Sequence, residues 1–155
     1  MTEPVGEVEV LSGTAAGGLR WEVVCSGDDA DLYTMLRVYS GDKRVVAGSG
    51  FGGPKLRPGS VMSEWRGRTD NLPYFVVART APAVTQVVAT TDRGSDVVLE
   101  LSEPVDRFGL RFAAAALPPG HMPATIRAER DGAVLEERPQ PMPRPFRAPG
   151  RGPHT

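Results

Sequence analysis

Apolar residues recur at every second position through much of this chain, and this spacing constrains its fold more than any other feature. A period of two places the apolar side chains on one face of a β-strand. Trp21 shares such a face with Val23, so its ring is predicted to lie in the core. The clearest alternating runs are residues 19–25, 32–39, 97–101, 110–116 and 126–129.

Turn-forming residues separate these runs. Asp131-Gly132 lies between residues 124–130 and 133–137, and Asp92-Arg93-Gly94 separates another pair of runs. Asp-Gly between two alternating runs is a strong signal for a two-residue hairpin, because both central residues need positive φ. About nine or ten short strands result, at a rhythm typical of sandwiches and barrels. We therefore predict an all-β fold, an antiparallel immunoglobulin-like β-sandwich.

The chain divides near residue 138. Residues 1–137 are predicted to form the β-sandwich domain, and residues 138–155 a disordered tail, because closely spaced prolines exclude helix and remove backbone donors. Four of the 18 basic residues are arginines in this tail, which has no Asp or Glu, so residues 1–137 carry a net charge of −5. We expect a protein partner, contacted in part through Arg144 and Arg147, and at most weak binding of nucleic acid through the tail.

Net charge and cysteine content limit the cellular compartment and the kinds of partner expected for this chain. The net charge of −1 gives no global attraction to nucleic acid or membrane. Cys25 is the single cysteine, so no intrachain disulfide can form and a reducing compartment is expected. Residues 1–4 lack a basic signal-peptide start, and no run of about 18 apolar residues could span a membrane. A cytoplasmic location follows as an expectation, and the oligomeric state stays open.

Residues 48–71 show the weakest pattern and are predicted to be a long loop or irregular strand, with Trp65 folded back onto the core. Within them, residues 48–53 match the dinucleotide-binding pattern G-x-G-x-x-G. That pattern needs a following helix whose N-terminus meets the pyrophosphate. Pro54 and Pro58 exclude this helix, so the match is interpreted as a flexible loop.

No group of residues predicts catalysis or metal binding. Asp28, Asp29 and Asp31 lack the spacing of a calcium loop and are interpreted as a solvated turn. Cys25 lies in an inward-facing register, which favours a buried structural thiol over a nucleophile paired with His121. We predict no catalytic residue, no cofactor and no metal site.

Two strand glutamates could in principle form a carboxylate pair for glycoside hydrolysis. The separation of such a pair is set by the fold rather than by the sequence. Glu100 and Glu129 lie on the polar faces of their strands and are interpreted as solvated charges.

The strand at residues 32–39 carries the candidate interaction residues of the domain. Tyr33, Met35, Arg37 and Tyr39 share one face, which would form an interaction patch if exposed. The preferred alternative is that this strand is central and buried on both faces.

The second half of the chain carries a resemblance. Residues 84–91, Asp92-Arg93-Gly94, residues 97–101 and 108–117, and Asp131-Gly132 follow one another in an order similar to small β-sandwich modules of high-GC actinobacteria. The resemblance covers roughly residues 72–137. It implies an immunoglobulin-like architecture without a shared active site, and such a fold does not by itself indicate a function.

These observations favour a non-catalytic protein-interaction or accessory module. The first alternative is an envelope-associated or extracellular binding module. The second is a small-ligand carrier or hydrolase with a pocket near residues 48–65, which convergence of Arg57, Glu64, Arg66 or His121 would support.

Overall fold

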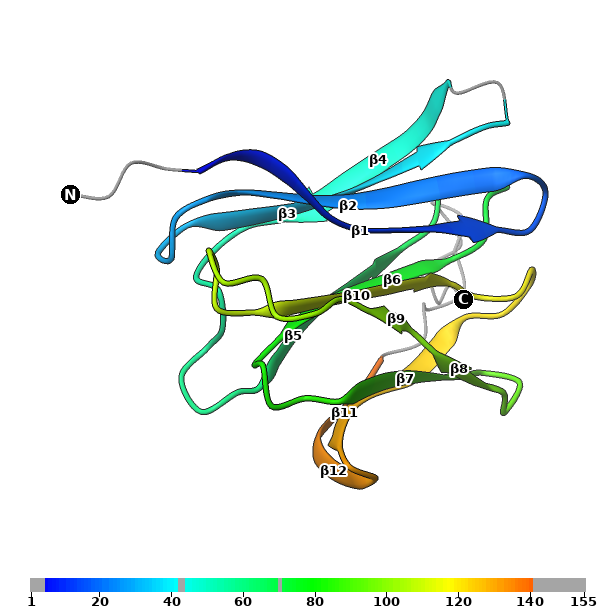
Figure 1. The fold of residues 1–155 in the computed structure, drawn as a ribbon. Coiled ribbons are helices and arrows are strands. Elements are labelled where there is room, and N and C mark those ends of the chain that lie inside the picture. The colour runs from blue at the N-terminus through cyan, green and yellow to red at the C-terminus, as the bar shows by residue number, and fades with distance from the viewer. Residues whose placement is uncertain (1–4, 42–43, 70, 141–155) are drawn as a thin grey trace, which may run out of the picture.

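The computed structural model describes residues 5–41, 44–69 and 71–140. Over these ranges it contains twelve strands, all paired antiparallel, and no helix, which confirms the all-β prediction. The strands form three four-stranded sheets, which we name A, B and C, and these are stacked as three layers (Figure 1). The part of the chain described here therefore has no helix long and apolar enough to cross a membrane.

Sheet A contains the first four strands, each paired with its neighbour in the chain. Its outer strands, β1 and β4, each have one free edge. The strands of sheet A are β1 (Val5–Ala15), β2 (Leu19–Gly27), β3 (Leu32–Tyr39) and β4 (Val45–Phe51).

Sheets B and C share the remaining strands. The chain passes from sheet C to sheet B at Leu99, a buried residue between β8 and β9 whose N–H donates to the Val87 carbonyl (2.9 Å). In spatial order, sheet B is β5 (Met62–Gly67), β6 (Phe75–Thr80), β10 (Arg111–Ala116) and β9 (Glu100–Leu101). Sheet C is β12 (Ala133–Pro139), β11 (Pro123–Arg130), β7 (Gln86–Thr91) and β8 (Asp96–Val98).

Sheet B is the middle layer, and both of its faces are covered (Figure 1). From β6, Val76 and Ala78 pack into the core shared with sheet C, whereas Phe75 and Val77 pack into the core shared with sheet A. The alanines of β10 divide in the same way, with Ala113 on one side and Ala114 on the other. Because each residue of β6 is buried, this strand shows no alternation of apolar and polar residues.

Sheet A covers sheet B with one face and leaves the other face outward. Trp21 is buried in the core between the two sheets, as predicted. In β3, Leu36 and Val38 lie in the same core, whereas Tyr33 is 41% exposed on the opposite face. The preferred prediction that β3 is buried on both faces is therefore wrong, because sheet A has a neighbouring layer on one side alone.

The hairpin between β11 and β12 has the predicted conformation. Asp131 and Gly132 both have positive φ, 49° and 88°. Two consecutive residues with positive φ are what a two-residue turn of the hairpin type requires.

Other predictions differ from the structure. The three sheets hold more strands than the nine or ten predicted, and an immunoglobulin-like sandwich of two sheets is not confirmed. Residues 48–71 contain the end of β4 and the whole of β5 rather than one long loop. β12 continues to Pro139, and the Gln140 N–H donates to the Ala124 carbonyl (2.7 Å), beyond the predicted domain boundary. Arg144 and Arg147 lie outside the described residues.

Candidate functional site

The free edge of β4 presents glycine backbone to its surroundings. The Leu32 N–H donates to the Gly53 carbonyl (2.8 Å), which fixes the phase of hydrogen bonding between β3 and β4. Directly opposed residues of an antiparallel ladder alternate between bonded and non-bonded pairs. The backbone groups of Ser49 and Phe51 therefore point toward β3, and those of Gly48 and Gly50 point toward the free edge.

Steric crowding against β3 explains one of the glycines in residues 48–53. A Cβ added to Gly50 would lie 2.5 Å from the Thr34 carbonyl oxygen and 3.1 Å from Cζ of Tyr33. Glycine at this position thus lets β4 lie close to β3 beneath the Tyr33 ring. Gly48 differs, because its nearest contact would be the Leu36 carbonyl oxygen at 3.7 Å, an ordinary van der Waals distance. The interpretation of residues 48–53 as a flexible loop is wrong up to Phe51, which is the last residue of β4.

From Ala47 to Phe51 this edge has little of the usual protection against pairing with another chain. Proteins commonly place charges, proline or a bulge inside an exposed edge strand. β4 contains neither proline nor a charged residue, and its register irregularity lies at its start, opposite Tyr39. The strand also exposes two apolar side chains, Val45 (59%) and Val46 (42%).

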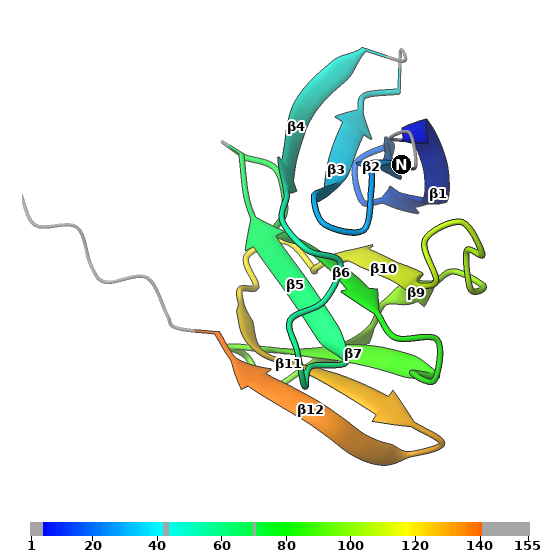
Figure 2. The same ribbon diagram turned by 90° about the vertical axis from the view of Figure 1, so that its left-hand side faces the viewer.

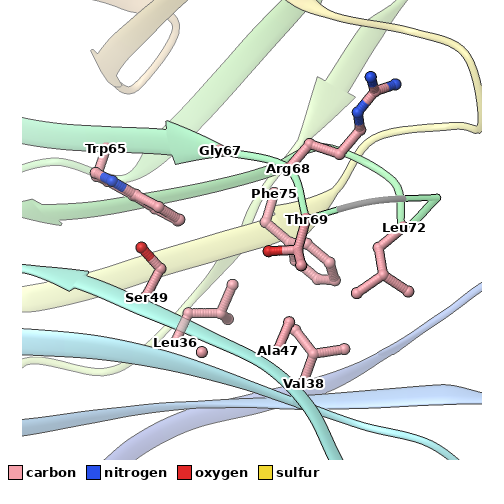
Figure 3. A pocket seen from close by; sticks show the side chains of 11 residues that line it. Leu36, Val38, Ala47, Ser49, Trp65, Gly67, Arg68, Thr69, Leu72 and Phe75 are labelled. Atoms are coloured by element: carbon pink, nitrogen blue, oxygen red, sulfur yellow. The ribbon is translucent and has the colours of Figure 1, made fainter.

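The free edges of β4 and β5 lie on the same side of the molecule (Figure 2). Between them lies an apolar groove, which is narrow, with a volume of about 20 Å³. Figure 3 shows Trp65 and Phe75 of sheet B facing Leu36, Ala47 and Ser49 of sheet A across this groove, with the Arg68 guanidinium turned away from it. The residues that line the apolar groove include Leu36, Val38, Ala47, Ser49, Trp65 and Phe75.

A second, wider depression of about 290 Å³ is lined by Phe51 at the end of β4, and we call it the basic cleft. Three guanidinium groups and one carboxylate line it, so its formal charge is positive. Its principal lining residues are Phe51, Arg57, Ser63, Glu64, Arg79 and Arg138.

Arg79 is held at the base of the basic cleft and is 1% exposed. Its Nε and both of its Nη atoms donate to neutral acceptors alone, and its Cζ lies 4.5 Å from the centre of the Phe51 ring. Burial lowers the pKa of this guanidinium, although Cys25 nearby acts in the opposite direction. The acceptors are the carbonyl oxygens of Leu32, Gly53, Pro54 and Lys55 and the hydroxyl of Thr34.

Arg138, in contrast, is neutralised by neighbouring carboxylates. It forms ion pairs with Glu136 and with Glu64 (3.2 Å). Glu136 also accepts hydrogen bonds from the Val61 N–H (2.8 Å) and the Ser60 hydroxyl (2.9 Å). Burial alone would raise the pKa of Glu136, but these hydrogen bonds and Arg138 together hold the pKa below its usual value. The network ties β12 of sheet C to the start of β5 in sheet B.

Replacing Glu136 with glutamine is expected to lower the free energy of unfolding by about 1–2 kcal/mol at pH 7, because its donors lose a charged acceptor. The pKa of Glu136 is lower in the folded protein, so its stabilisation is complete above the ordinary value of 4.5. The stabilisation is lost as the pH falls through the pKa that Glu136 has in the folded protein. Urea titrations at pH 7, 5 and 3 should therefore show the unfolding free energies of the original protein and of Glu136→Gln becoming more similar as the pH falls.

The control is Glu137→Gln, on the exposed side of the same strand. It should change stability by less than about 0.5 kcal/mol at each pH. A Glu136→Gln difference that persists undiminished at pH 3 would contradict this role of the carboxylate.

The predicted interaction residues of β3 lie together on the outer face of sheet A, but that face is not an apolar patch. Arg37 forms a bidentate pair with Glu7 (both 2.6 Å), and the Tyr39 hydroxyl donates to Glu22. The side chains of Met35 and Arg37 are half-buried. Their role in binding stays a prediction.

The other sequence candidates serve structural contacts. Burial raises the pKa of the Cys25 thiol, whose sulfur lies 3.6 Å from Thr34 Oγ1, as expected for a structural cysteine. His121 Nδ1 lies 2.9 Å from Thr91 Oγ1 and does not line the basic cleft. Asp28 accepts hydrogen bonds from the backbone of its own turn. Among the described residues no three His, Cys, Asp or Glu side chains are grouped for a metal ion.

The two strand glutamates have different environments. Glu129 is buried and pairs with Arg127 (2.6 Å), so its interpretation as a solvated charge is wrong. Glu100 is exposed, as predicted. Arg57 and Glu64 meet in the basic cleft, as the ligand-carrier alternative anticipated, but neither Arg66 nor His121 lines it.

Sequence reasoning missed Arg79 and the free edge of β4. Arg79 directly follows the apolar run of residues 75–78. This position indicates a buried charge, but the sequence does not indicate which acceptors it contacts. The glycines at 48, 50 and 52 stand at every second position, the spacing of a strand.

Comparison of the chain with protein-family models, with curated proteins and with solved structures gave no match.

Proposed function

We propose that this protein is a non-catalytic binding module that takes up an extended segment of a partner protein by strand addition to β4. The observation that carries the proposal is the open edge of β4, which has no charged residue and no proline and where the outward backbone groups belong to Gly48 and Gly50. A strand added at an open edge gains main-chain hydrogen bonds, and pockets beneath its alternate side chains provide selectivity. The apolar groove and the basic cleft lie below this edge.

The single buried cysteine supports a cytoplasmic setting for this module. Kinship with actinobacterial immunoglobulin-like modules is a further part of the proposal, supported by the order of strands and turns in residues 72–137.

The test is selection of phage-displayed random dodecapeptides on the full-length protein, followed by affinity measurement with synthetic copies. Gly48→Pro removes one edge N–H without touching the ladder to β3, and proline is tolerated where its missing donor faces outward. We expect this variant to lose at least about tenfold in affinity, the equivalent of one good interaction of about 1.4 kcal/mol.

Gly48→Ala is the matched control, because it adds a Cβ at the same place but keeps the N–H. It should bind the selected peptides as the original protein does. Failure to select any peptide, or equal binding by Gly48→Pro, would refute strand addition to β4.

A further inference from the structure

We infer that the segment bound on β4 carries a carboxylate side chain, which the basic cleft receives, two or four residues away from a small apolar side chain in the apolar groove. This inference rests on the proposed function and assigns the chemistry of its partner.

The basic cleft has positive charge that the described residues do not balance. Arg138 is paired with Glu64 and Glu136. Arg79 contacts neutral acceptors alone, and Arg57 forms no ion pair with any residue the structure describes. Three guanidinium groups face the two carboxylates of Glu64 and Glu136, so one net positive charge acts on whatever enters a cleft of about 290 Å³. This positive charge is local to the cleft, since residues 1–137 as a whole carry a net negative charge.

The available hydrogen-bond donors fit a carboxylate. All donor nitrogens of Arg79 are engaged, so this residue contributes its charge from the base of the cleft rather than a direct contact. The exposed Arg57 side chain is available for a bidentate pair, the geometry in which guanidinium binds carboxylate most strongly. Ser63 also lines the cleft, and its hydroxyl has no hydrogen bond within the described part of the chain.

The register of β4 sets the spacing. Side chains of an added strand alternate between its two faces, so those opposite Ala47, Ser49 and Phe51 point inward. Ala47 and Ser49 line the apolar groove, whereas Phe51 lines the basic cleft. The groove, with about 20 Å³, is narrow and suits a small apolar side chain, and the cleft, with about 290 Å³, is wide enough for Asp or Glu. Sheet A is antiparallel throughout, so the acidic residue should precede the apolar one.

Neither the proline-rich end of this chain nor a second β4 fits as the occupant, which favours a segment of a different protein. Residues 138–155 contain no Asp or Glu, so this part of the chain cannot supply the carboxylate. β4 has none either, which excludes pairing between the β4 strands of two copies as the interaction that fills the cleft.

The experiment repeats the dodecapeptide selection on the full-length protein and on Arg57→Glu. We expect peptides from the original protein to carry Asp or Glu two or four residues before Val or Ala. Arg57→Glu should bind these peptides at least about tenfold more weakly, and its own selection should favour Lys or Arg at the acidic position. The affinity of the original protein should also fall as salt rises from 50 to 300 mM, and that of Arg57→Glu should not.

Arg130→Glu makes the same charge change at an exposed position of sheet C and is the control, expected to leave affinity unchanged. Thermal unfolding of each variant verifies that it is folded. Peptides without an acidic preference, or equal affinity for Arg57→Glu, would overturn the inference. If Gly48→Pro still abolished binding in that case, strand addition to β4 would stand and the carboxylate alone would be refuted. If no peptide were selected, both would fall.

Discussion

Replacing Arg79 with methionine is expected to lower the free energy of unfolding by about 3 kcal/mol, because several buried acceptors lose their donors together. The guanidinium joins β6 of sheet B to Leu32 and Thr34 of sheet A, and it also holds the carbonyl groups that follow β4. Methionine has a similar length and no charge, so removal of a buried cation offsets part of the loss. Urea unfolding followed by circular dichroism measures the difference.

Arg79→Lys separates the role of the charge from that of the planar fork. Lysine keeps a cation but has a single donor group, so it cannot reach acceptors on β3 and on the loop after β4 at once. We expect it to be destabilised nearly as much as Arg79→Met. A change within about 0.5 kcal/mol for either variant would show that the acceptors find water or other donors at little cost.

The second large effect is expected for Trp21→Ala, which should lower the free energy of unfolding by about 4 kcal/mol, as is typical for removal of a large buried aromatic side chain. Trp21 is buried between sheets A and B, and its ring lies against Gly13, whose added Cβ would come within 2.3 Å of it.

Trp65→Ala provides the comparison within the same protein. Trp65 packs against the same core but is partly exposed at the apolar groove, so its removal should have roughly half the effect. Equal destabilisation by the two substitutions would contradict the layer assignment. Because these are the two tryptophans of the chain, each variant also isolates the fluorescence of the other, and Trp65 should report peptide binding at the groove.

The strands that the sequence predicted best are those with one buried face. Residues 32–39 alternate because sheet A covers sheet B with one side of β3, and the predicted and observed bounds coincide. β6 was not predicted as a separate element, since Phe75–Thr80 is buried on both faces and has no period. Alternation of apolar and polar residues thus marks β3, which has one face toward water, and is missing from β6, which has none.

The candidate site was harder to predict for a related reason. The register between β3 and β4 decides which glycine groups face outward, and it depends on pairing rather than on composition. Likewise, Arg57, Ser63 and Arg138 come from three separate segments and meet only because β12 lies beside the start of β5. The glycine spacing was visible in the sequence, but the nucleotide-loop pattern drew the interpretation toward a loop.

The passage of the chain through Leu99 has a consequence for how the layers can come apart. One uninterrupted segment supplies β8 to sheet C and β9 to sheet B, so neither of these sheets can detach without pulling on the other. Sheet A has no such covalent crossover and is built from consecutive hairpins ending at Phe51. Amide protons of sheet A should accordingly exchange through a local opening that leaves sheets B and C intact. The partner-binding edge of β4 would then belong to the least stable layer of the molecule.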